Sequence, residues 1–271
     1  MRYLKAVPYW LLVCAMAFFF LFPLYILFKI SFSAPQDVFA PRPPYLLRHF
    51  TPQHFLDVFS SGTVFSQPLV KSLAVGILSS LGSLVLSIPA AYAISRLGYR
   101  LRYILVLAIF ITRMFPEVSI ALPVSIFFIK AGLYDTLFGL TLAHIIRNLP
   151  VACFIMTGVF SGFPWELEKQ AMIDGASRLS AFFKVVLPLT AGGMTVAAIF
   201  SFMLSWDEFI FASYLTLAQP TMPVKMYYYV SRGDIFSSAA YAVIITVPVL
   251  VMTIALQKYL RPDYLAGAVK G

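Results

Sequence analysis

Charged side chains within apolar segments are the residues of this sequence most able to do chemistry. Arg113 and Glu117 lie four residues apart, so a helix would place them on one face. In an apolar environment such groups are costly, and they usually mark a solute pathway, a proton relay or a contact between helices. Pro116 lies between them and predicts a kink, and broken helices build midplane sites in transporters. A site for a polar solute and a structural ion pair both fit this pattern.

A second polar group occurs where His144, Arg147 and Asn148 fall within about one helical turn. The side chain of Arg147 is long enough to extend to the edge of a bilayer. A third group is formed by Asp207 and Glu208, which follow Trp206, and the indole ring offers a surface on which a sugar could stack. Since the two acids are adjacent, they point in different directions, and at most one should face a pathway. The candidate pathway residues are Arg113, Glu117, Asn148, Trp206, Asp207 and Glu208.

Several catalytic patterns are missing from the sequence. It has no Gly-x-x-x-x-Gly-Lys-Ser/Thr phosphate loop, no His-Glu-x-x-His zinc pattern and no Gly-x-Ser-x-Gly elbow. The three histidines, His49, His54 and His144, do not have zinc-binding spacing. We therefore expect no enzyme activity, no catalytic residues, no metal site and no cofactor in this chain.

The composition predicts that lipid surrounds the elements that carry these groups. Of the 271 residues, 61% are hydrophobic and 11% charged, against roughly 45–50% and about 25% in soluble domains. The net charge of +9 is spread over the ends of apolar segments, which argues against nucleic-acid binding. Cys14 and Cys153 lie inside apolar runs, so a disulfide is not expected. The sequence thus predicts an all-α, polytopic membrane protein with a single membrane domain over residues 1–271.

Runs of about 20 apolar residues predict six transmembrane helices. They cover residues 7–30, 70–94, 103–128, 138–159, 189–214 and 239–256. A long outer loop over about residues 31–69 is rich in proline in its first half, which predicts extended backbone there. Residues 53–59 are expected to form a short helix against the membrane surface.

The lysines and arginines between these segments predict the orientation. With both termini in the cytoplasm, eleven Lys and Arg fall in cytoplasmic segments and five in outer ones, or seven if Lys29 and Lys71 at the span edges are included. The positive-inside rule therefore favours cytoplasmic termini. The eleven are Arg2, Lys5, Arg96, Arg100, Arg102, Lys169, Arg178, Lys184, Lys258, Arg261 and Lys270.

The cytoplasmic loop over about residues 162–188 reads as helix, turn, helix. Pro164 and the acids after it suit the first turn of a helix, and Gly175 suits a left-handed residue that closes it. Ser177 can cap the next helix, which Pro188 limits before the fifth span. Such a hairpin is either a docking element for a soluble partner or a simple connector.

This loop resembles the coupling-loop signature of permeases of ATP-binding cassette (ABC) importers, which reads Glu-Ala-Ala, two variable residues, Asp-Gly-Ala, then Phe and Leu-Pro at a fixed distance. The residues that match are Ala171, Asp174, Gly175, Ala176, Phe182, Leu187 and Pro188. Ser177 is a common choice at its position, whereas Lys169 and Gln170 stand where the family usually has Glu and Ala. The resemblance implies that these residues contact the ATPase subunit, with Glu168 as a substitute for the missing Glu.

The resemblance extends along most of the chain. Several segments are similar to the carbohydrate-uptake branch of the family, in particular to the smaller permease of maltose and trehalose importers. The segments concerned are residues 114–117, 132–136, 149–150, 206–209 and 266–271. Asp207 replaces a frequent Asn in this comparison.

What the resemblance implies is one subunit of a larger complex with the type I importer permease fold and a cytoplasmic coupling helix. A second, usually unlike, permease, an ATPase dimer that holds ATP and Mg²⁺, and an extracytoplasmic solute-binding protein would be its partners. The substrate would be a sugar, and the location the plasma (inner) membrane of a bacterium or archaeon. Two alternatives are a proton-coupled secondary transporter that uses Glu117 or Asp207, in which the coupling loop has no purpose, and a membrane enzyme.

Overall fold

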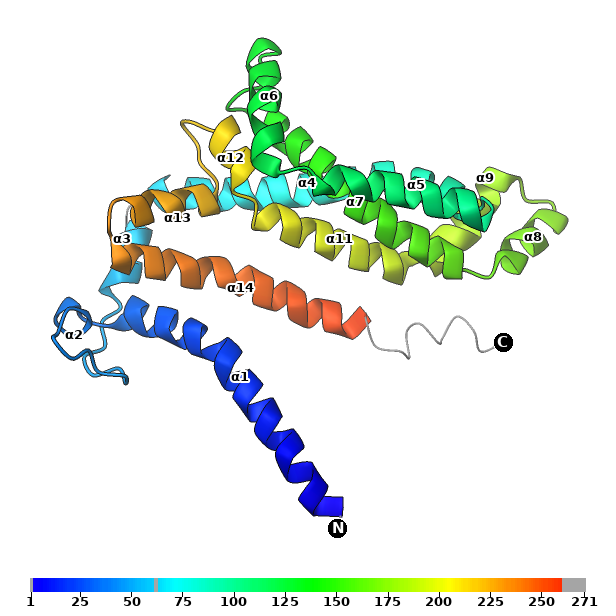
Figure 1. Ribbon diagram of the computed structural model, residues 1–271. Helices are drawn as coiled ribbons and strands as arrows, with labels where there is room; N and C mark the ends of the chain where they lie inside the picture. The colour runs from blue at the N-terminus through cyan, green and yellow to red at the C-terminus, as the bar shows by residue number, and fades with distance from the viewer. Residues whose placement is uncertain (1, 61–62, 260–271) are drawn as a thin grey trace. The chain divides into compact units, whose positions relative to one another are not determined.

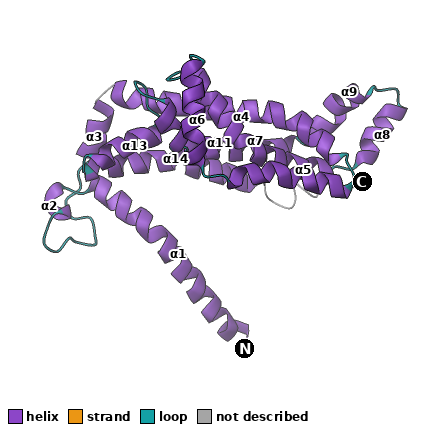
Figure 2. Cartoon of the chain, turned by 45° about the horizontal axis from the view of Figure 1, so that its top comes forward, coloured by secondary structure: helices purple, strands orange, loops and turns teal. Residues whose placement is uncertain are grey.

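The computed structural model describes residues 2–60 and 63–259. Every regular element in this part of the chain is a helix (Figure 2), which confirms the all-α prediction. Four of the described helices are long and apolar enough to cross a membrane, and two bent helix pairs bring the number to six if each pair is one span. The prediction of about six spans is thus confirmed if each bent pair counts as one broken span.

The chain divides into two compact units, residues 1–67 with 222–248 and residues 68–221 with 249–271. Two long helices, α4 and α14, contribute to both units. The first unit holds most of the segment predicted as the outer loop, and the second holds every residue that the sequence placed in the pathway or the coupling loop.

In the first unit, α1 is an apolar helix whose described side chains are largely exposed. The predicted helix at residues 53–59 is confirmed as α3, and its Phe55 stacks on Phe32 with ring centroids 4.6 Å apart. The expectation of extended backbone is wrong for α2, because Pro35 at its start suits the first turn of a helix. The helices are α1 (Arg2–Phe32), α2 (Pro35–Val38), α3 (Gln53–Ser60), α13 (Met222–Ser231) and the first part of α14 (Ile235–Tyr259).

In the second unit, α4, α7 and α11 run alongside one another, and α5 lies against α7 (Figure 1). Small residues permit this close packing. A Cβ atom added to Gly193 on α11 would lie 2.4 Å from the Val159 side chain of α7. The long helices are α4 (Thr63–Ser95), α5 (Tyr99–Ile111), α6 (Glu117–Lys130), α7 (Leu137–Gly162) and α11 (Ala191–Trp206).

Two of the six spans are interrupted. The third bends by 84° between Met114 and Glu117, which confirms the kink predicted at Pro116. The fifth was predicted as one helix over residues 189–214, and this is wrong. It bends by 71° near Thr190 and stops after Trp206, and a short helix, α12 (Ile210–Leu215), follows after residues 207–209.

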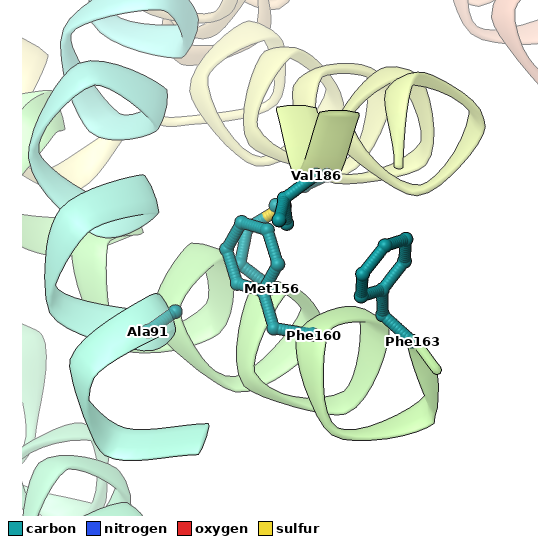
Figure 3. Packing of buried hydrophobic residues seen from close by; sticks show 6 residues of the cluster. Ala91, Met156, Phe160, Phe163 and Val186 are labelled. Atoms are coloured by element: carbon teal, nitrogen blue, oxygen red, sulfur yellow. The ribbon is translucent and has the colours of Figure 1, made fainter. Parts of the chain in front are cut away.

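A hydrophobic cluster joins α4, α7, α11 and the loop between α7 and α11, at the end of the second unit where that loop lies (Figure 3). Met156, Phe160 and Phe163 come from α7 and the residue after it, Ala91 from α4, and Val186 from a π-helical turn, η2 (Phe182–Val186). The π-helical turn precedes Pro188, which has no N–H with which to continue an α-helical ladder. The cluster fixes the second half of the loop to the long helices.

Candidate functional site

The loop between α7 and α11 forms a compact helical hairpin. Its first helix, α8 (Trp165–Ile173), ends in a Schellman motif, in which Ala176 N–H donates to Ala171 O over 3.0 Å and Gly175 N–H donates to Met172 O over 3.1 Å. Gly175 has φ +94°, a value that side chains disfavour. Ser177 caps α9 (Arg178–Ala181) through a 3.2 Å hydrogen bond from Ser180 N–H. The predicted helix–turn–helix is confirmed in each of these details.

The tip of the hairpin presents apolar side chains that no residue in the described part of the chain covers. Ile173 is 82% exposed and Leu179 70% exposed, and Trp165 is also exposed. Asp174, Gly175 and Ser177 lie exposed between them, whereas Ala171 and Ala176 are half-buried. Exposed apolar groups on a small projecting element are typical of a protein contact surface. The residues predicted to couple to an ATPase thus lie on one accessible tip, except for those at its base.

The base of the hairpin is tied to the end of α4. Glu168 is 5% exposed, and its carboxylate accepts hydrogen bonds from Tyr92 Oη and from Arg96 Nη2, the latter over 2.5 Å. Phe182 packs on the Tyr92 ring at 4.6 Å, and Pro188 follows in α10 (Leu187–Leu189). The carboxylate of Glu168 is therefore engaged within its own chain.

Lys169, which stands where the family usually has Glu, packs on the same hairpin. Its Nζ lies 3.4 Å from the centre of the Trp165 ring, a cation–π contact at an exposed position. The ammonium group holds the exposed Trp165 against α8 and leaves positive charge at the hairpin surface.

A polar triad occupies the break in the third span. Glu117 Oε1 pairs with Arg113 Nη1 at 3.1 Å and with Arg147 Nε at 2.9 Å. Arg147 also donates to Leu204 O over 2.7 Å, which connects α7 with α11. The triad borders a cavity of about 140 Å³ that is also lined by Phe211 of α12. The Arg147 side chain is therefore engaged between helices, and the structure joins the first two polar groups of the sequence.

A second set of polar groups is fully buried between helices. His144 and Glu208 are each about 1% exposed in their side chains, with Nε2 and Oε2 3.2 Å apart. His144 Nδ1 lies 2.6 Å from Ser205 Oγ, and Asn148 donates to Ser201 O over 3.0 Å. These contacts connect α7 with α11 and with the break after it.

The residues at the fifth-span break differ sharply in their environment. The Glu208 carboxylate accepts N–H hydrogen bonds from Phe211 at 2.7 Å and from Ala212 at 2.9 Å, so it caps α12. Asp207 is exposed, as expected if only one acid faces a pathway. Trp206 is 1% exposed and stacks on Phe202, so in this conformation its ring has no open face for a sugar.

An ion pair that the sequence did not indicate lies at the opposite end of the second unit. Asp135 accepts N–H hydrogen bonds from Leu217 at 2.9 Å and Ala218 at 3.0 Å, and Lys71 Nζ lies 3.9 Å away. Burial alone would raise the pKa of Asp135, but these N–H donors and the Lys71 charge together hold it below its ordinary value. Asp135 has a positive φ of 54°. The sequence contains no local signal for this backbone conformation.

Comparison with known proteins identifies relatives of this chain. The family model described as "Binding-protein-dependent transport system inner membrane component" matches residues 83–265. The chain belongs to this family. The resemblance proposed from the coupling loop is thereby confirmed, although residues 266–271 lie outside the described part of the structure.

Curated members of the family and solved structures resemble the chain over most of its length. A trehalose transport system permease protein of Mycobacterium tuberculosis is 35% identical over 216 residues, which cover 78% of this chain and 79% of that protein. A trehalose/maltose transport system permease protein of Thermococcus litoralis is 31% identical and covers 94% of each chain. A bacterial ABC transporter involved in the import of the polysaccharide alginate matches with a TM-score of 0.76 at 21% identity, over 95% of this chain and 97% of that one. This last likeness confirms the importer permease fold.

Proposed function

We propose that this permease forms part of the membrane pathway of an ATP-driven importer for a sugar, with the α8–α9 hairpin as its contact to the ATPase. The observation that carries the proposal is the exposed apolar tip around Gly175, held on a base that is tied to α4 and α7. The family match and the sugar transport systems named among the relatives support it. A self-contained proton-driven transporter would leave this tip without a use.

In this mechanism the chain does no covalent chemistry. ATP and Mg²⁺ belong to a partner ATPase dimer, and a force on the hairpin tip passes through Glu168 and the Met156–Phe160 cluster into α4 and α7. The breaks at residues 115–116, at Thr190 and at residues 207–209 are the places where the spans can bend. Arg113, Glu117 and Asp207 are the residues we assign to the pathway side of these breaks.

The partners follow from the same proposal. They are a second permease, which completes the pathway, an ATPase dimer at the hairpin and a solute-binding protein on the outer face. The solved alginate importer that includes a periplasmic protein supports a binding-protein partner. In this complex we assign no role to nucleic acid.

The test is co-purification and transport. The tagged permease should carry an ATPase subunit through purification, and the reconstituted complex should show ATP-dependent sugar uptake. The isolated chain should show neither ATP hydrolysis nor transport. Sugar flux driven by a proton gradient through the isolated chain would overturn the proposal.

The proposed orientation places both termini in the cytoplasm, because cytoplasmic segments carry more Lys and Arg than outer ones. Reporter fusions after Gly98 and Gly175 should report the cytoplasmic side, and a fusion after Ser60 the outer side. If the fusions after Ser60 and Gly175 report the same side, the orientation is wrong.

A further inference from the structure

A groove between α5 and α7 is larger than the cavity at the polar triad. It has a volume of about 390 Å³ and lies at the end of the second unit that carries the hairpin. Its walls are largely apolar, with Tyr103 and Val106 on α5 and Phe154 and Val159 on α7. Gly158 forms part of the floor, and a Cβ atom there would meet nothing within 4 Å.

One wall of this groove carries an arginine without a counter-charge. Arg102 donates from Nη1 to Ser161 Oγ over 3.0 Å and from Nη2 to Leu97 O over 3.2 Å. Its Nε is buried and has no hydrogen-bond partner, and no carboxylate lies within ion-pair distance of it among the described residues. Arg96, six residues earlier, is by contrast paired with Glu168. The groove therefore combines apolar walls with an unbalanced positive charge.

We propose that this groove binds an anionic phospholipid. An acyl chain would lie along Val106, Phe154 and Gly158, and the headgroup phosphate would contact the accessible N–H groups of Arg102 and the Ser161 hydroxyl. Basic pockets between transmembrane helices on the cytoplasmic side are suited to anionic lipid headgroups. A free anion would use only the arginine, and a neutral lipid only the walls.

The position of the groove along the helices agrees with this ligand. Arg102 lies in the first turn of α5, and α4, which precedes it, is tied to the hairpin through Arg96. Tyr99 and Tyr103 are exposed at the same end, where aromatic residues typically meet the membrane–water interface. The headgroup would therefore lie at the membrane surface that faces the ATPase under the proposed function.

The test is native mass spectrometry of the detergent-released complex, titrated with phosphatidylglycerol and with phosphatidylcholine of the same acyl chains. One phosphatidylglycerol should bind more tightly than phosphatidylcholine. Arg102→Gln should weaken that binding by about fivefold, as expected for one cation at a lipid headgroup. Arg100→Gln removes an exposed neighbouring charge outside the groove and should leave it unchanged.

A second pair of variants tests the apolar walls. Gly158→Leu should fill the groove and abolish the bound lipid, whereas Gly192→Leu, which also has open space around its Cβ, should retain it. Unchanged phosphatidylglycerol binding in both Arg102→Gln and Gly158→Leu would overturn the proposal. Displacement of the bound phosphatidylglycerol by millimolar inorganic phosphate would also overturn it. Dissociation of the complex in the Gly158→Leu variant would do the same, because it would mean that a partner helix fills the groove. Lipid counts do not depend on uptake, so a wrong substrate assignment would leave this result unaffected.

Discussion

A Gly175→Val permease is expected to reach the membrane and bind its partner subunits poorly or unproductively. Gly175 has φ +94° and closes the Schellman motif of α8. A β-branched residue in a left-handed conformation costs about 1–2 kcal/mol, which the hairpin can relieve only by changing the angle between α8 and α9. That free energy corresponds to roughly tenfold weaker docking. Uptake by the reconstituted complex and its ATPase activity would both be measured.

The matched controls separate backbone conformation from side-chain size. Asn tolerates the left-handed region, so Gly175→Asn should retain more activity than Gly175→Val. Gly98 lies in the loop between α4 and α5 with φ −56° and open space, so Gly98→Val should be close to wild type. Normal uptake and ATP hydrolysis in Gly175→Val would make the hairpin a simple connector.

The base of the hairpin offers a second way to disturb the same element. Glu168→Gln would weaken the bond to Arg96, whereas Glu166→Gln removes an exposed charge from the same helix turn. We expect only the first to reduce uptake, together with faster hydrogen exchange over α8. If the two substitutions reduce uptake equally, the negative charge of α8 matters more than the contact between Glu168 and Arg96 that anchors the hairpin.

Replacing Glu208 by Ala is expected to destabilise the permease rather than to block a pathway selectively. The carboxylate caps α12 and is the buried partner of His144. Loss of a cap costs about 1 kcal/mol, and buried polar groups left without partners cost about 1–3 kcal/mol more. The melting temperature of the purified complex and the yield of assembled complex should therefore both fall.

Asp207→Ala is the control at the adjacent position. Asp207 is exposed, so this substitution should leave melting unchanged, and any loss of uptake would assign Asp207 to the pathway. If instead Glu208→Ala melts normally but stops uptake, Glu208 is a pathway residue and its cap is dispensable.

The sequence predicts the hairpin well because its determinants are local. Gly175, Ser177 and Pro188 each act on the backbone within a few residues of themselves. The fifth-span break is different, since apolar residues continue through Ile210 and Phe211 and hydropathy alone cannot reveal it. The break becomes visible only when the Glu208 carboxylate is seen to cap a new helix.

For a related reason, the sequence could not predict which charged side chains pair between different spans. Arg113 and Glu117 are near neighbours in the chain, so their pairing could be predicted, but Arg147 reaches Glu117 from another helix. The Arg147 side chain is also long enough to reach the bilayer edge, so its length alone does not distinguish that position from pairing with Glu117. In the structure the Arg147 side chain pairs with Glu117 and donates to Leu204 O on α11, which decides between the two positions.

Helix α7 runs without interruption from Leu137 to Gly162, whereas the third and fifth spans beside it are broken. It holds Arg147 and Asn148 at one level, Met156 roughly two turns further on and Phe160 roughly three and a half turns further on. The intact helix therefore connects the two levels rigidly, whereas the spans on either side are interrupted between them. Any rotation or tilt of α7 would therefore move the cluster beneath the hairpin and the polar groups at the breaks together.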